Sequence, residues 1–126
     1  QWHKTLSYSD SFFGDGQQFD KEFTDLYGYA PPYQAAESAA ALLVYKAAFE
    51  QADSFDKEKV RDALAQTDMQ TFYGNIKFSD AGQNIAKPMV LFQVRCEGDE
   101  CANRVVAPTK WASHELVHPT PSWSTR

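Results

Sequence analysis

The sequence predicts an α/β fold in which three helices come first and are followed by a β-hairpin region and an extended tail. Apolar residues recur at helical spacing as far as Thr67 and at a spacing of two beyond it. Few strands lie between the helices, so the sheet against which they would pack is missing from these 126 residues. We therefore expect the chain to be a piece of a larger α/β structure. The absence of an initial Met supports this expectation.

Two helices are predicted in the first half of the chain. In residues 16–28 the apolar side chains fall on one helical face, and Gly28 is a suitable C-terminal stop. Two prolines then lead into a helix over residues 33–52. Its middle, residues 39–44, is apolar all round, which is typical of a helix buried on most sides.

A third helix is predicted to begin at Asp56, whose side chain is a good N-cap, and to end near Thr67. Phe55 before the cap and Val60 after it have the spacing of a hydrophobic staple. The strands that follow are expected near Phe72 and over residues 75–78, 88–95 and 104–107, with residues 108–126 as the extended tail.

Composition excludes several classes of function. The chain has 12 Lys and Arg against 17 Asp and Glu, a net charge of -5, and no basic stripe that would neutralise nucleic-acid phosphates. We therefore expect no nucleic-acid partner. The longest apolar run, residues 39–44, is far shorter than the roughly 20 residues that a membrane-spanning helix needs.

Cys96 and Cys101 flank a four-residue segment whose two sides both resemble strands. This spacing predicts a disulfide that closes a β-hairpin, worth about 1 to 2 kcal/mol because the loop is short. Stable disulfides belong to oxidising surroundings such as the periplasm, so the bridge would also indicate the compartment. The alternative is two free thiols on a loop.

The segment His114-Glu115-Leu116-Val117-His118 matches the H-E-x-x-H pattern of zinc-dependent hydrolases. That chemistry needs both imidazoles on one helical face and a third ligand downstream. Prolines follow the segment at once and no usual third ligand follows it. We therefore predict no catalytic residue, no metal site and no cofactor, and a zinc hydrolase stays the alternative.

Other chemical motifs are weak or missing. Gly14, Asp15 and Gly16 lack the third glycine of a dinucleotide-binding loop and are predicted to form a turn. The chain contains neither a nucleophile elbow nor a phosphate-binding loop. These patterns give hydrolase and nucleotide-binding functions no specific support.

Residues 29–38 carry the most promising binding chemistry. They place aromatic, acidic and hydroxyl side chains at the start of the helix over residues 33–52, where free N–H groups and the helix dipole favour an anion. Tyr33 could contact a ligand ammonium group, and Glu37, one turn further along, could pair with it. The alternative is that Tyr33 packs in the core while Glu37 only caps or solvates the start of the helix.

Several sequence blocks along the chain have a recognisable pattern. They are Y-G-Y-A-P-P-Y-Q-A-A at residues 27–36, F-D-K-E-K-V-R-D-A-L at 55–64, T-F-Y-G-N-I-K-F at 71–78, and the shorter G-Q-N at 82–84 and K-P-M at 87–89. Together they resemble the C-terminal part of type I periplasmic solute-binding proteins of the branched-chain amino acid (Leu/Ile/Val-binding) ABC transporter family. The Cys96 to Cys101 hairpin is not a general feature of that family.

This resemblance implies a two-lobed Rossmann-like protein that closes on its solute by a hinge. Residues 1–126 would be its C-terminal portion, with about 1–95 mainly in one lobe and 96–126 forming hairpin, crossover and tail. Cleft residues would be Tyr33, Gln34 and Glu37 with Trp2 near a crossover, and none would be catalytic.

The implied ligand is an amino acid or amide-like solute, and the implied partner is an ABC transporter permease in a periplasmic or extracytoplasmic location. A homo-oligomer is possible if the isolated segment exposes its lobe interface. A ligand-sensing regulator built on the same fold is a further alternative.

Overall fold

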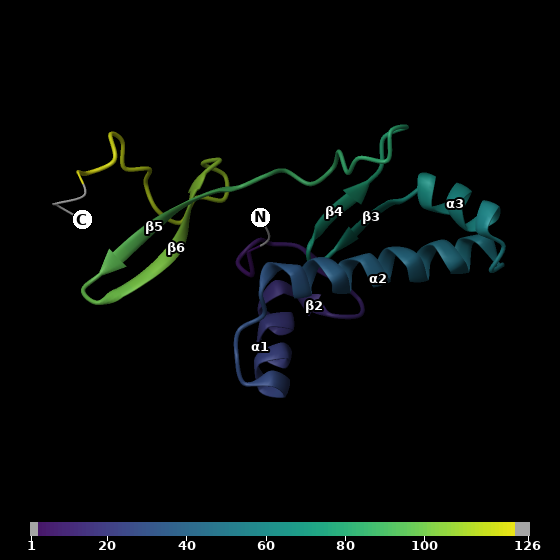
Figure 1. Cartoon of the computed structure of the whole chain (residues 1–126), viewed down its shortest axis with the longest axis horizontal. Helices are drawn as coiled ribbons and strands as arrows, with labels where there is room; N and C mark the ends of the chain where they lie inside the picture. Colours follow the sequence, from purple (N-terminus) through teal and green to yellow (C-terminus); the bar gives the residue numbers. More distant parts are fainter. Residues whose placement is uncertain (1–2, 123–126) are drawn as a thin grey trace. The chain divides into compact units, whose positions relative to one another are not determined.

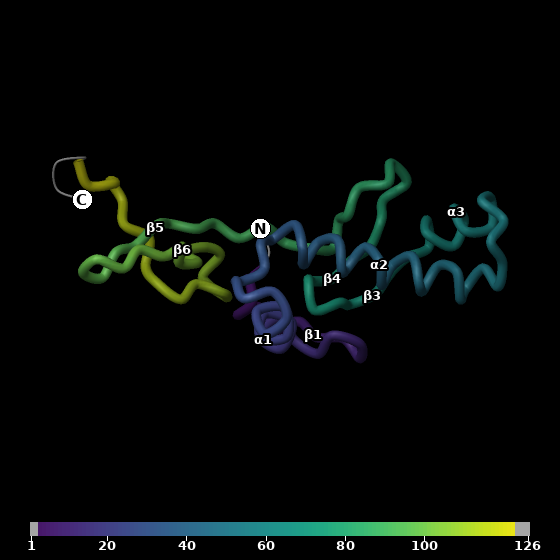
Figure 2. The backbone as a smooth tube through the Cα atoms, turned by 60° about the horizontal axis from the view of Figure 1, so that its bottom comes forward, coloured from purple at the N-terminus to yellow at the C-terminus, as the bar shows by residue number. Residues whose placement is uncertain are grey.

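The computed structural model of the chain describes residues 3–122, which form two compact units that divide between Pro88 and Met89. In the described part of the chain there are three α-helices and three two-stranded antiparallel sheets (Figure 1). The first unit holds all three helices and two of the sheets, and the second holds a single long hairpin (Figure 2). The chain is therefore of mixed helix and strand composition, as the sequence predicts.

The first helix, α1 (Gly16–Tyr27), is capped at both ends by the residues that flank it. Asp15 Oδ1 accepts hydrogen bonds from the backbone N–H groups of Gln17 and Gln18, both at 2.9 Å. At the other end Gly28 adopts φ 76° and donates its N–H to a carbonyl of the last turn. The predicted stop at Gly28 is confirmed.

Two short strands precede α1, β1 (Ser9–Asp10) and β2 (Gly14–Asp15), and they pair antiparallel. The sequence predicts only a turn at residues 14–16. That prediction misses the pairing, because two-residue strands leave no alternating pattern to detect.

The second helix, α2 (Tyr33–Ala52), is buried along one stripe only. The stripe consists of Ala36, Ala40, Leu43, Val44 and Ala48. On another face Leu42 is 68% exposed, so the prediction of burial on most sides is wrong for the described chain. Side-chain composition alone cannot tell how many neighbours a helix has, and the described neighbours of α2 leave this face uncovered.

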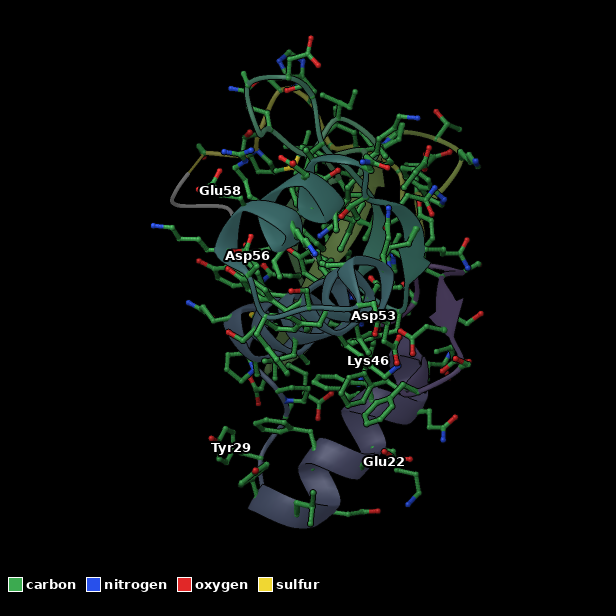
Figure 3. All side chains as sticks on the ribbon, turned by 90° about the vertical axis from the view of Figure 1, so that its right-hand side faces the viewer. Glu22, Tyr29, Lys46, Asp53, Asp56 and Glu58 are labelled. Carbon is green, nitrogen blue, oxygen red and sulfur yellow. A yellow bond between two sulfur atoms is a disulfide. The ribbon has the colours of Figure 1, made fainter. Side chains whose placement is uncertain are left out.

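The third helix, α3 (Lys57–Ala65), begins where the sequence predicts. Asp56 Oδ1 accepts hydrogen bonds from the N–H groups of Glu58 and Lys59, both at 3.1 Å; Figure 3 labels Asp56 and Glu58 at this end. The predicted staple does not form, because Phe55 is 89% exposed and its ring lies 5.3 Å from that of Phe49. Phe55 therefore contacts Phe49 near the end of α2 instead of Val60.

The core of the first unit lies between α1, α2 and the hairpin of β3 (Asp68–Thr71) and β4 (Gly74–Lys77). Phe72, in the hairpin turn, is fully buried and stacks on Phe19 of α1 with ring centroids 4.4 Å apart. Figure 1 shows this hairpin beside the middle of α2. Aromatic packing therefore joins the hairpin turn to α1.

Asp10 also ties the start of the chain to this hairpin. Its Oδ1 accepts hydrogen bonds from Phe12 N–H at 2.9 Å and Phe13 N–H at 2.8 Å. Its Oδ2 accepts one from Phe72 N–H at 2.7 Å, across 62 residues of sequence. One carboxylate thus satisfies three backbone donors beside the core.

The second unit is built on β5 (Leu91–Glu97) and β6 (Glu100–Ala107). Cys96 and Cys101 are direct partners in this ladder and form a disulfide, with Cα atoms 4.0 Å apart. The predicted bridge is confirmed. Both strands continue past their predicted limits to a two-residue turn, because the cysteines are paired in register rather than held in an open loop.

The tail after β6 lies against its own hairpin over the described residues 108–122. Ser113 N–H donates to Val105 O at 2.9 Å. The Gln93 side chain makes two bonds with Val117, donating from Nε2 to its carbonyl at 3.0 Å and accepting its N–H at 3.1 Å. A side-chain amide on β5 thereby holds the tail as a strand partner would.

Candidate functional site at the start of α2

The three cleft residues predicted on α2 are all exposed at its N-terminal end. Tyr33 is 43% exposed and Gln34 and Glu37 are also open to solvent. Pro32 occupies the N-cap position and no side chain caps the helix. Tyr33 is therefore not fully packed in the core and Glu37 does not cap the helix, whereas the solvated Glu37 that the alternative also allows agrees with its exposure. In the first turn Ala35 N–H donates to Pro32 O at 3.0 Å, so the N–H groups of Tyr33 and Gln34 are the ones that a ligand could use.

Two residues that the sequence did not indicate lie beside this helix end. Lys87 Nζ stands 3.0 Å from the centroid of the Tyr73 ring. The Lys87 stem crosses Gly74, where an added Cβ would approach Lys87 Cγ and Cδ to 3.2 Å. Gly74 also has φ 141°, a backbone conformation that residues with a side chain rarely adopt, so the backbone favours glycine here.

Electrostatic effects link these side chains to Glu37. Burial lowers the pKa of Lys87 from 10.5 to about 8, and the nearby Glu37 carboxylate opposes that shift. The pKa of Tyr73 is raised by burial first, then by Glu37 and by Tyr33. We call Tyr33, Glu37, Tyr73 and Lys87 the α2 entry cluster. It combines an acid, a base and two phenol rings beside open helix N–H groups.

The sequence could not have revealed this cluster, because Glu37 and Lys87 are 50 positions apart and no local spacing connects them. Of the residues it predicted, Tyr33 and Glu37 belong to the cluster. Gln34 lies on the same first turn of α2. Trp2 lies outside the described residues.

The depressed pKa of Lys87 predicts a stability that depends on pH. Between pH 8 and 10.5 the unfolded chain binds more protons at Lys87 than the folded chain, so the free energy of unfolding should rise with pH. Tyr73 has the opposite effect from about pH 10 upward, because its raised pKa makes the unfolded phenol ionise first. The predicted increase is therefore clearest between pH 8 and about 9.5.

Urea denaturation at pH 7.5 and 9.5 tests this prediction. The Lys87→Met variant keeps the stem and should lose most of the increase seen in the unchanged chain. Lys59→Met, on the exposed face of α3, should retain it. An equal increase in both variants would contradict the assignment to Lys87.

The segment with the zinc-hydrolase pattern does not have the geometry that such a site needs. His114, Glu115 and His118 lie on non-helical backbone, so the two imidazoles are not one turn apart on a helical face. Instead, His114 Nδ1 lies 3.1 Å from Ser113 Oγ, within hydrogen-bond distance. His114 Nε2 lies 4.0 Å from Glu97 Oε1. Among residues 3–122 no group of three or more His, Cys, Asp or Glu side chains is placed to hold a metal ion.

Among the described residues, no helix combines the length and apolar character required to cross a bilayer.

Comparison with known proteins identifies the family. No solved structure matches the chain. A family model described as periplasmic binding protein matches residues 5–100, about three quarters of the chain, and this span includes all of α1, α2, α3 and the α2 entry cluster. Proteins of that kind bind small solutes outside the cytoplasm, and the chain belongs to the periplasmic binding protein family.

Proposed function

We propose that the chain is part of the extracytoplasmic solute-binding component of an ABC transporter, and that its solute is an amino acid or a similar small polar molecule. Membership of the periplasmic binding protein family supports the general role. The observation that carries the proposal is the α2 entry cluster, where Glu37 acts on both Lys87 and Tyr73 beside an uncapped helix end. Such a site offers complementary groups for both charges of a zwitterion.

The cluster can divide these two charges between its parts. The ammonium group of the solute would pair with Glu37 and lie against the Tyr33 ring. The carboxylate would accept hydrogen bonds from the N–H groups of Tyr33 and Gln34 in the first turn of α2, and Lys87, which interacts electrostatically with Glu37, would supply a positive charge. Binding and release by these groups involve no bond chemistry, which supports a transport role rather than an enzymatic one.

In this proposal the chain contributes to a two-lobed protein in which the solute is enclosed by hinge closure. About residues 1–95 would belong mainly to one lobe, and 96–126 would supply the hairpin, crossover and tail. The closed form would be recognised by a membrane permease. The blocks that resemble Leu/Ile/Val-binding proteins favour branched-chain amino acids as the first solutes to test.

Calorimetric titration and thermal shift of the chain with leucine, valine, glutamine and acetamide would test the proposal. At least one solute should bind, and Glu37→Gln should weaken its binding by about threefold to tenfold because an ion pair is lost. Glu50→Gln, the same change near the other end of α2, should leave binding unchanged. No binding at millimolar solute, or equal binding by both variants, would count against the proposed site.

A further inference from the structure

A hollow in the first unit lies between α2, α3 and the β3–β4 hairpin. It is a groove of about 640 Å³, within the size range of small-molecule sites. Its floor includes the buried side chains of Ala40, Val44 and Ile76. Ala40 and Ala41 on α2 and Ala65 on α3 line it with single methyl groups, so the packed elements leave space between them. The groove therefore offers an apolar surface to a bound molecule.

The charges around this groove are predominantly negative. Glu37 and Asp80 line it, and neither carboxylate forms a hydrogen bond or ion pair with another described residue. Arg61 also lines the groove, but its guanidinium is held by Glu58 and Asp62 on its own helix. A positive group entering the groove would thus meet two carboxylates. Asp80 has no hydrogen-bond or ion-pair partner among the described residues, and Glu37 interacts with Lys87 only through longer-range electrostatics.

Two of the other polar side chains that line the groove, Ser79 and Asn84, already bind backbone groups. The Asn84 amide accepts from the N–H groups of Lys77 and Ala86 and donates to Asn75 O, so the backbone already uses it. Tyr45, which is 49% exposed, adds an aromatic wall. An aromatic ring attracts an organic cation and also packs against an apolar ligand body.

We propose that this groove binds a small organic cation, an amine with an aliphatic or aromatic body. The apolar body would lie over Val44 and Ile76, and the positive group would face Asp80 and Glu37. A zwitterion is less suitable, because its carboxylate would lie near the same two acids. This second ligand goes beyond the proposed function, and of the α2 entry cluster only Glu37 and Tyr73 border the groove.

A charge series of probes tests the proposal on the whole 126-residue chain. The probes are 2-phenylethylamine, 2-phenylethanol and 3-phenylpropionate, which have similar shapes and carry positive, zero and negative charge. Titration followed by amide chemical shifts should show the amine binding most tightly and the carboxylate most weakly, with the largest shifts near Val44 and Ile76. Equal binding of amine and alcohol, or no binding of the amine at millimolar concentration, would overturn the proposal.

Three variants locate the site. Ala41→Leu fills the groove from an exposed position and should abolish amine binding, while circular dichroism confirms that the fold is retained. Asp80→Asn should weaken amine binding by about threefold, as expected for an exposed ion pair. Asp99→Asn, the same change in the β5–β6 turn, is the matched control and should have no effect. Unchanged amine binding in Ala41→Leu would place the amine elsewhere and reject the groove.

The same variants separate this proposal from the amino acid site. Tyr33→Ala removes a ring that does not line the groove, so it should weaken amino acid binding and leave amine binding intact. Ala41→Leu should have the reverse effect. If the amine binds while every amino acid fails, the groove stands and the proposed function fails; the opposite result rejects only the groove.

Discussion

Replacing Phe72 by alanine is expected to lower the free energy of unfolding by about 3 to 5 kcal/mol, the typical loss for a buried Phe→Ala change. The Phe72 side chain is 0% exposed, and its ring stacks on Phe19 at 4.4 Å and meets the edge of Phe13 at 5.2 Å. Removing it leaves a cavity where α1 meets the hairpin turn. A chain with a small hydrophobic core has few other contacts to compensate for this loss.

Urea denaturation followed by far-UV circular dichroism would measure the effect of the Phe72 change. Phe55→Ala is a matched control, because the same atoms are removed from a side chain that is 89% exposed. That variant should change the free energy of unfolding by less than about 0.5 kcal/mol. Similar losses in the two variants would show that Phe72 is not in the core.

Replacing Asp10 by alanine should lower the free energy of unfolding by about 2 to 3 kcal/mol, because three backbone N–H groups lose their acceptor. Two of them belong to Phe12 and Phe13 in the β1–β2 turn, and the third belongs to Phe72. The bonds to Phe13 and Phe72 are partly buried, so water replaces the carboxylate poorly. Asp10→Asn keeps one acceptor oxygen and should recover part of the loss.

Thermal and urea unfolding of the Asp10 variants would be compared with Asp25→Ala. Asp25 is exposed on α1, and its ion-pair partner among the described residues is Lys21 one turn away, so its loss should cost about 0.5 kcal/mol or less. Amide exchange at Phe72 should also accelerate in Asp10→Ala. If Asp10→Ala and Asp25→Ala are equally stable, the three hydrogen bonds do not hold the turn to the hairpin.

The two proposed sites give Glu37 a particular position in the molecule. It belongs to the α2 entry cluster and also lines the groove beside α3. A positive ligand group bound at one site would partly neutralise Glu37. The other site would then attract a second positive ligand group less strongly. Competition between amine and amino acid, weakened in Glu37→Gln, is the expected consequence.

Aromatic residues are also exposed away from both sites. Tyr29, in the loop between α1 and α2, is 58% exposed, and its ring meets Phe23 of α1 edge-on at 5.5 Å (Figure 3). In the described chain this ring rests on α1 rather than on the cluster at Tyr33. Tyr29 therefore packs on α1, whereas Tyr33, the first residue of α2, is exposed in the entry cluster.

Local chemistry was sufficient to predict the helices, the cap at Asp56, the stop at Gly28 and the disulfide. Asp56 and Gly28 act within a few residues of their own positions, so side-chain type and backbone freedom decide where α3 begins and α1 ends. The cap at Asp15 is equally local, although the sequence predicts only a turn there. Cys96 and Cys101 are likewise near neighbours in sequence, and a hairpin between them was enough to predict their bond. The family, too, was recognisable from short blocks.

Contacts between distant residues could not be predicted in the same way. The contact of Lys87 with the Tyr73 ring and its electrostatic interaction with Glu37 depend on how the β3–β4 hairpin and the loop after it pack beside α2. The exposed Leu42 and Phe55 depend on which faces the neighbouring elements cover. Sequence patterns record local preference, whereas burial and electrostatic partners arise from long-range packing, and the packed structure was needed to place the entry cluster and the groove.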